Sequence, residues 1–146
     1  MYNSSSQKPF RIQPSITVDN QHFWTGGQNN QLCFLHCQDC KTWIHPPQPI
    51  CPECTGKNIK PEAVSGKATV HSFTVNRQAW IPGFDPPYVI GLVEIDEDPR
   101  VRLMTNIINC DVESVYIGMK VKVIFEEQEG GIIYIPLFEP AEKNNR

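Results

Sequence analysis

The sequence predicts a mainly β protein, in which a short N-terminal helix and a four-cysteine metal ribbon precede a five-stranded barrel. Three observations support this fold class. Four of the six cysteines form two C-x2-C pairs. Five strand-sized apolar segments follow them, separated by turn sequences. Thirteen prolines among 146 residues leave little room for long helices.

The net charge of the chain argues against one class of function, that of proteins that bind phosphates over their whole surface. The chain carries 13 Lys and Arg against 16 Asp and Glu, a net charge of −3. This is the wrong sign for a protein that binds phosphates over its whole surface. No basic stretch leads into an apolar run at the start, so we expect no secretory signal peptide. We therefore expect a cytoplasmic protein, in a reducing compartment where clustered cysteines bind metal more often than they form disulfides.

Residues 1–30 form a polar segment that contains the predicted helix. Asp19 is positioned to cap a helix over residues 20–25, and the two glycines that follow would end it. A helix of two turns is not stable alone, so Phe23 and Trp24 are expected to dock it against the rest of the protein. A second interpretation is that this aromatic pair also borders a ligand groove.

Residues 31–62 are expected to form a rubredoxin-like zinc ribbon. Two C-x2-C turns, with ten residues between them, supply the four predicted metal ligands Cys37, Cys40, Cys51 and Cys54. Four thiolates suit tetrahedral zinc and leave no position for water or substrate, so the zinc would be structural. Short strands over 32–36 and 43–45 flank the first pair. Apolar content is too low here for an independent core, and the metal would replace it.

Other interpretations of the cysteines stay open. An iron-bearing rubredoxin-type centre would use the same ligands, and redox dithiols or disulfides are a further possibility. His36 or His45 would replace one cysteine in a mixed site. Cys33 and Cys110 are expected to be packing residues, because four residues of extended strand put Cys33 roughly 13 Å from the first ligand.

Residues 63–140 are predicted to form an OB-type barrel, followed by a tail over 141–146. The expected strands cover residues 67–75, 88–95, 100–108, 117–126 and 131–138. Residues 68, 70, 72 and 74 are expected to share one face of the first strand. Two tight turns and one long loop connect the strands, as in a small closed barrel. No alternation of strands and helices is present, which counts against a doubly wound sheet.

The long loop over residues 76–87 concentrates large apolar side chains beside prolines. Stiffened in this way, its aromatic residues would pack against a partner at low entropic cost. The alternative is that the loop folds back as a lid on its own barrel. The candidate ligand- or partner-binding residues are Phe23, Trp24, Trp80, Phe84 and Tyr88.

At this point the sequence resembles the bacterial and archaeal zinc-ribbon/OB-fold family that is associated with acyl-CoA metabolism. The resemblance rests on the cysteine pairs and on seven segments in order: FWTG at 23–26, IHPP at 44–47, PGFDPPYVI at 82–90, LVEIDE at 92–97, TN at 105–106, IGMKV at 117–121 and PLF at 136–138. The usual glycine after each C-x2-C pair is Lys41 in the first pair and displaced to Gly56 in the second, but all four ligands are present.

The resemblance implies an accessory role. Members pair with thiolase-like enzymes, including lipid-transfer-type thiolases, and some are fused to enoyl-CoA hydratase-like domains. They are thought to bridge subunits and to help hold the pantetheine arm of an acyl-CoA. The chain is then a non-catalytic subunit with structural zinc, a thiolase-like or other acyl-CoA-processing partner, and acyl-CoA as a ligand.

Nucleic-acid binding and independent catalysis are the two alternative functions. Zinc ribbons and OB barrels also bind nucleic acids. From residue 63 onward, however, eight basic residues face twelve acidic ones, whereas residues 1–62 carry five and four, so the acidic excess lies in the barrel. An independent enzyme is disfavoured, because we identify neither a nucleophile–base pair nor an open metal position.

Overall fold

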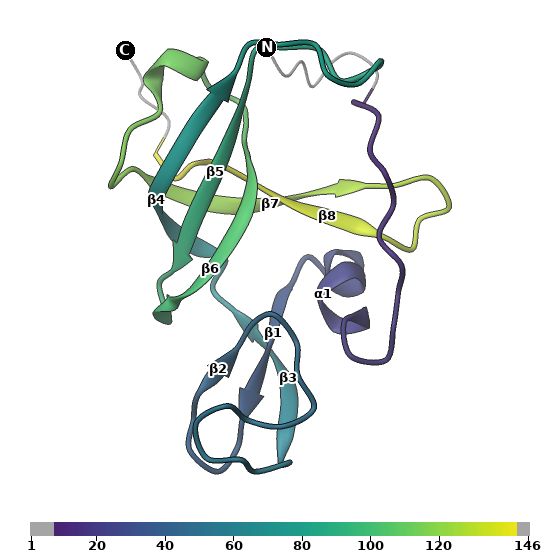
Figure 1. Cartoon of the computed structure of the whole chain (residues 1–146), viewed down its shortest axis with the longest axis vertical. Coiled ribbons are helices and arrows are strands. Elements are labelled where there is room, and N and C mark those ends of the chain that lie inside the picture. The colour runs from purple at the N-terminus through teal and green to yellow at the C-terminus, as the bar shows by residue number, and fades with distance from the viewer. Residues whose placement is uncertain (1–7, 143–146) are drawn as a thin grey trace.

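The computed structural model describes residues 8–142. Figure 1 shows a small ribbon at one end of the molecule and a barrel at the other, with a short helix beside their junction. Residues 1–7 of the predicted N-terminal segment and 143–146 of the predicted tail lie outside the described residues. No helix within 8–142 has both the length and the apolar character that a membrane span requires.

The predicted N-terminal helix is present as α1 (Gln21–Thr25), and it ends at Thr25 as predicted, but its N-cap differs from the prediction. The N-cap residue is Asn20 rather than Asp19, and no side chain caps the helix. Gly26 is the C-cap of α1, and the chain continues from it as the 3-10 helix η1 (Gly26–Asn29). A Cβ on Gly27 would lie 2.3 Å from the Cβ of Tyr134, so this glycine permits close packing on the barrel.

The ribbon is a three-stranded antiparallel sheet in the order β2-β1-β3. The strands β1 (Leu32–Cys37) and β2 (Trp43–Ile44) were predicted from the sequence. The third strand, β3 (Ile59–Val64), was not predicted, because a proline at position 61 and the polar residues around it are not typical of a strand. As an edge strand, β3 pairs on one side only and tolerates a proline.

The barrel is closed, in the order β4-β5-β6-β8-β7, which confirms the predicted five-stranded architecture. A short 3-10 helix, η2 (Val112–Ser114), connects β6 to β7. All neighbouring strands run antiparallel except β6 and β8, which are parallel and share the single registered pair Ile107 and Phe138. The strands are β4 (Lys67–Asn76), β5 (Tyr88–Ile95), β6 (Asp98–Ile107), β7 (Lys120–Glu127) and β8 (Tyr134–Pro140).

A β-bulge in β4 corrects the predicted alternation of that strand. The register with β5 shifts between Val70 and Ser72. Ala68 and Val70, before the bulge, are buried. Beyond the bulge, Phe73 and Val75 pack against the core, whereas Ser72 is exposed. One extra residue in a strand moves every later side chain to the opposite face.

The main hydrophobic core extends from the barrel into the N-terminal half of the chain. Phe23 of α1 and Leu32 and Phe34 of β1 belong to the same buried cluster as the barrel residues. A separate small cluster lies in the ribbon and contains two of the four cysteines that are predicted to bind metal, together with Leu35 and Ile44. The barrel therefore anchors the helix and the first ribbon strand, whereas the far end of the ribbon has little apolar core of its own.

Candidate metal centre and apolar groove

The two C-x2-C turns have matching backbone geometry. Lys41 N–H donates to the Cys37 carbonyl, and Thr55 N–H donates to the Cys51 carbonyl, at 3.0 and 2.9 Å. Lys41 and Thr55 both adopt left-handed backbone conformations, with φ of 65° and 61°. This conformation is ordinarily favourable only for glycine, which explains why a glycine is usual after the cysteine pair. The turns therefore keep their shape without the glycine.

The four cysteine sulfurs of the two turns converge. All lie within 4.8 Å of one another, with Cys37 Sγ 3.6 Å from Cys54 Sγ and Cys40 Sγ 3.5 Å from Cys51 Sγ. Zn–S distances of about 2.3 Å in a tetrahedron place sulfurs about 3.8 Å apart, so the donor set fits zinc. Disulfide bonds would require about 2.05 Å.

A polar neighbour already favours a thiolate in this cluster. Cys40 Sγ lies 3.1 Å from Thr42 Oγ1. The side-chain and backbone hydrogen bonds from Thr42 lower the pKa of Cys40 to about 6. The backbone hydrogen bond from Gly56 lowers the pKa of Cys54, but hydrogen bonds with the other cysteine thiols together outweigh it and raise this pKa to about 12. Since metal binding requires thiolates, Cys40 is predisposed to bind metal, whereas Cys54 must lose its proton when the metal binds.

The histidines considered for a mixed site do not join the cysteine cluster. His36 Nδ1 lies 2.9 Å from Glu62 Oε2, and His36 Nε2 lies 3.1 Å from the Lys41 carbonyl oxygen. The His36 ring also stacks on Trp43, with centroids 4.0 Å apart. His45 packs instead against aromatic rings of α1 and β1. Cys33 and Cys110 are also outside the cluster and half-buried.

An apolar groove of about 320 Å³ lies where β6 and β8 separate. Pro136 in β8 has no N–H and cannot donate a ladder hydrogen bond to β6. Thr105 Oγ1 of β6 donates to the Pro136 carbonyl instead, at 3.0 Å. The side chains that line the groove come from α1, the loop 77–87, β5, β6, β8 and the segment that precedes α1. They include Arg11, Phe23, Trp24, Ile81, Phe84, Tyr88 and Met104.

The structure brings four of the five selected aromatic residues to this groove. Phe23 and Trp24 contact each other edge to face, at 4.7 Å between ring centroids, and Phe84 and Tyr88 do the same at 4.3 Å. Trp80 is not among the lining residues. It is 71% exposed, with its indole N–H bonded to Asn76. One part of the loop 77–87 therefore packs on the barrel, and another part points outward.

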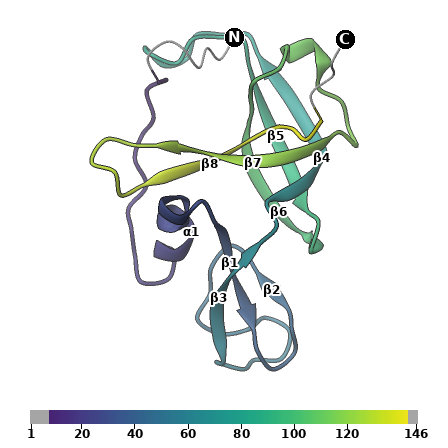
Figure 2. The same cartoon turned by 180° about the vertical axis from the view of Figure 1, so that it is seen from behind.

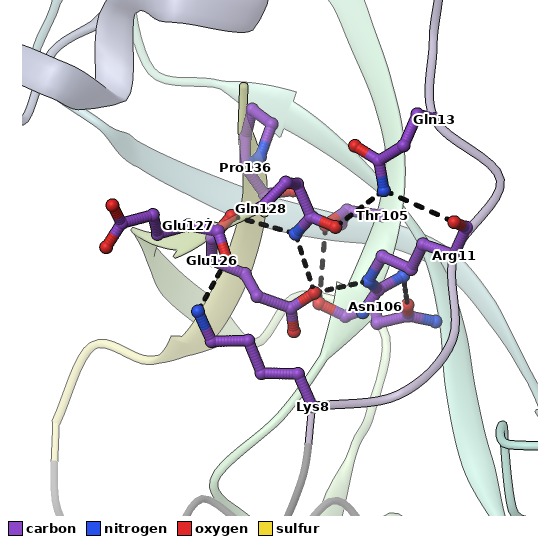
Figure 3. A network of polar contacts seen from close by, with 9 residues as sticks. All are labelled: Lys8, Arg11, Gln13, Thr105, Asn106, Glu126, Glu127, Gln128 and Pro136. Atoms are coloured by element: carbon purple, nitrogen blue, oxygen red, sulfur yellow. Dashed lines mark hydrogen bonds and ion pairs between the residues drawn. The ribbon is translucent and has the colours of Figure 1, made fainter. Parts of the chain in front are cut away.

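The N-terminal strap (residues 8–16) supplies a wall of the groove that the sequence did not predict. It runs beside the β7–β8 hairpin before the chain turns back into α1 (Figure 2). Figure 3 shows Arg11 reaching from the strap to Glu126 of β7 and Asn106 of β6. The Arg11 guanidinium also lies over the Phe84 ring, 5.1 Å from its centroid. Nothing in the sequence near Arg11 distinguishes it from other surface arginines.

Comparison with known proteins assigns both parts of the chain. A family model described as the rubredoxin-like zinc ribbon domain of ChsH2 matches residues 24–59, and one described as the C-terminal OB-fold domain of ChsH2 matches residues 61–126. A DUF35 domain-containing scaffold protein of Methanocaldococcus jannaschii is 35% identical over 119 residues, which cover 76% of this chain and 82% of the relative. The corresponding protein of Methanothermobacter thermautotrophicus is 37% identical over 112 residues, covering 73% of this chain and 83% of that protein.

A longer relative and a solved structure extend these similarities. A probable enoyl-CoA hydratase alpha subunit of Thermomonospora curvata is 33% identical over 139 residues, 94% of this chain, and the match spans only 43% of that relative's length. The solved structure of an Ltp2-ChsH2(DUF35) aldolase contains a chain that superimposes with a TM-score of 0.78 at 34% identity, covering 89% of this chain and 100% of that one. With its four-cysteine ribbon, its closed five-stranded barrel and these relatives, the chain belongs to the DUF35 family of zinc-ribbon and OB-fold proteins.

Proposed function

We propose that this protein is a non-catalytic accessory subunit that binds a thiolase-like, acyl-CoA-processing enzyme. The similarity to DUF35 scaffold proteins and to a chain of the Ltp2-ChsH2(DUF35) aldolase carries this proposal. Within residues 8–142, the one group of three or more potential metal ligands is the closed cysteine cluster, which leaves no open position for metal catalysis. Nothing in the structure or the comparisons favours nucleic-acid binding.

The metal centre has a structural role in this proposal. Cys37, Cys40, Cys51 and Cys54 hold one zinc ion, which cross-links the two turns at the end of the ribbon that has little apolar core. The zinc contributes folding free energy and takes no part in chemistry.

The apolar groove is proposed to help hold the pantetheine arm of the acyl-CoA. Its volume of about 320 Å³ and its aromatic walls suit an extended, uncharged chain with apolar segments between its amides. The groove lies beside the outward-facing part of the loop 77–87, so a partner enzyme bound through Trp80 would receive the ligand close to the interface.

The partner interface is tested by Trp80→Ala. Because Trp80 is exposed in the isolated chain, its removal should leave the fold intact while removing a large apolar contact from the interface. We expect at least tenfold weaker binding to a thiolase-like enzyme of the same organism, measured by co-purification of co-expressed proteins and then by calorimetry.

The matched control is Tyr116→Ala, which removes another exposed aromatic side chain, from the connection between η2 and β7. It should bind the enzyme as wild type does. Equal losses for both variants, or wild-type affinity for Trp80→Ala, would contradict the proposed interface.

A further inference from the structure

Arg11 is the one charged side chain among the described residues that line the groove. Taken by itself, an arginine among aromatic rings predicts a site for an anion such as a carboxylate or a phosphate. The surroundings of Arg11 indicate a different ligand.

The positive charge of Arg11 is already balanced by the carboxylate of Glu126. Arg11 Nε donates to Glu126 Oε1 at 2.7 Å, and the two side chains are only 13% and 3% exposed. The same Glu126 oxygen accepts a second hydrogen bond from Gln128 at 3.0 Å, which holds the carboxylate in place. Since the pair is neutral, an anionic ligand would bring an uncompensated charge into an apolar site, at a high desolvation cost.

One nitrogen of the Arg11 guanidinium nevertheless makes no hydrogen bond to the described residues. Nη1 donates to Asn106 Oδ1 at 3.0 Å, whereas Nη2 is buried and has no hydrogen-bond partner within residues 8–142. The Phe84 ring of the loop 77–87 lies over the guanidinium, with its centroid 5.1 Å from the guanidinium carbon, so the unpaired nitrogen lies close to the aromatic wall of the groove. An uncharged carbonyl oxygen would satisfy this donor without adding a charge.

We propose that the Arg11–Glu126 pair makes the groove selective for the uncharged, carbonyl-bearing part of an acyl thioester. The pair favours the pantetheine arm or the acyl chain next to the thioester, and it rejects a free fatty carboxylate. This inference rests on the proposed function of the groove as an acyl-CoA site. Arg11 and Glu126 are specificity-determining residues here, and the groove discriminates an intact thioester from its hydrolysed acid.

The selectivity is tested on the purified full chain by calorimetry with four probes. Octanoyl-CoA and octanoyl-pantetheine should bind within about threefold of each other, because the charged nucleotide of CoA lies outside the groove. Octanamide and octanoate are matched in shape and differ in charge, and octanamide should bind at least tenfold more tightly.

The variant Glu126→Gln leaves Arg11 with an uncompensated charge and should raise the affinity for octanoate at least tenfold. Glu127→Gln is the matched control, because this neighbouring carboxylate on β7 does not line the groove, and it should bind all four probes as wild type does. If Glu126→Gln does not fold, the octanamide and octanoate pair on the wild type still decides.

The outcomes distinguish a failure of the proposed selectivity from a failure of the groove as an acyl-CoA site. Equal wild-type affinity for octanoate and octanamide, together with tight binding of octanoyl-pantetheine, would overturn the selectivity and leave the groove as a thioester site. A folded Glu126→Gln without a gain for octanoate would do the same. If the wild type binds none of the probes, the groove has no ligand role and the inference fails with it, while co-purification still tests the partner.

Discussion

His45 is the residue whose environment has the clearest consequence for stability. Its ring packs against Phe23 and Phe34, at 5.1 and 4.9 Å between centroids, and its buried Nδ1 has no hydrogen-bond partner in the described part of the chain. Burial, together with the neighbouring His22, lowers the pKa of His45 to about 4. The folded protein therefore resists protonation of this ring.

This environment predicts acid sensitivity at the junction of α1 and the ribbon. Between the unfolded-state pKa near 6.5 and the folded-state value near 4, the unfolded chain binds the proton more readily. The contribution to stability is therefore complete above pH 6.5 and is lost as the pH falls toward 4. From this group we expect a loss of about 2 kcal/mol of unfolding free energy between pH 6.5 and 4.5.

Denaturant unfolding of the wild type and of His45→Phe at several pH values measures this contribution. The phenylalanine keeps the aromatic packing and cannot titrate, so its stability should fall less steeply with acid. Because both proteins keep the cysteine cluster, acid release of metal affects them alike. Parallel pH profiles would show that His45 does not contribute.

At the scale of elements, close packing of η1 on the β7–β8 hairpin fixes the position of α1. A Cβ on Gly27 would meet the Cβ of Tyr134 at 2.3 Å and the Phe125 ring at 2.8 Å. The helix itself has five residues and no side-chain cap, so it depends on this contact.

The substitution Gly27→Ala should destabilise the protein by about 1–3 kcal/mol, the usual cost of overpacking. Asn29→Ala, on the exposed side of the same 3-10 helix, is the control and should change stability by less than about 0.5 kcal/mol. Unfolding midpoints in denaturant provide the measurement. A stability for Gly27→Ala equal to that of the control would show that η1 does not pack this closely on the hairpin.

At the scale of the whole molecule, two different forces hold the two ends. The barrel has a continuous apolar core, whereas the far end of the ribbon has only a small cluster around two of the cysteines. Removal of zinc should therefore unfold the ribbon turns and leave the barrel folded.

Treatment with a strong chelator under reducing conditions tests this division. We expect hydrogen exchange to become fast over the two cysteine turns and to stay slow in β5 and β6. Cys51→Ser should behave in the same way, and Cys33→Ser, outside the cluster, should retain one zinc per chain. Cooperative loss of the barrel with the metal would show that the two parts fold as one unit.

Features that depend on short stretches of the chain could be predicted from the sequence. The C-x2-C turns and the apolar strands β4 to β8 follow from short-range patterns, and both are present in the structure. The bulge in β4 and the edge strand β3 were missed, because a bulge inserts one residue without changing composition and β3 is mostly polar. The Arg11–Glu126 pair joins residues 115 positions apart, and no local pattern encodes it. The four-part division of the chain and the ligand role of the aromatic residues stay predictions.

The contact between the N-terminal strap and the end of the barrel also bears on protein synthesis. The strap is made before the barrel, and Glu126 and Gln128, which it contacts, follow it by more than one hundred residues. On the ribosome, Arg11 therefore emerges long before Glu126 has been synthesised. The groove cannot be complete until β8, which lines part of it, has also been made. The ribbon cysteines lie close together and can bind metal early. We thus expect the metal centre to form during translation and the groove only near its end.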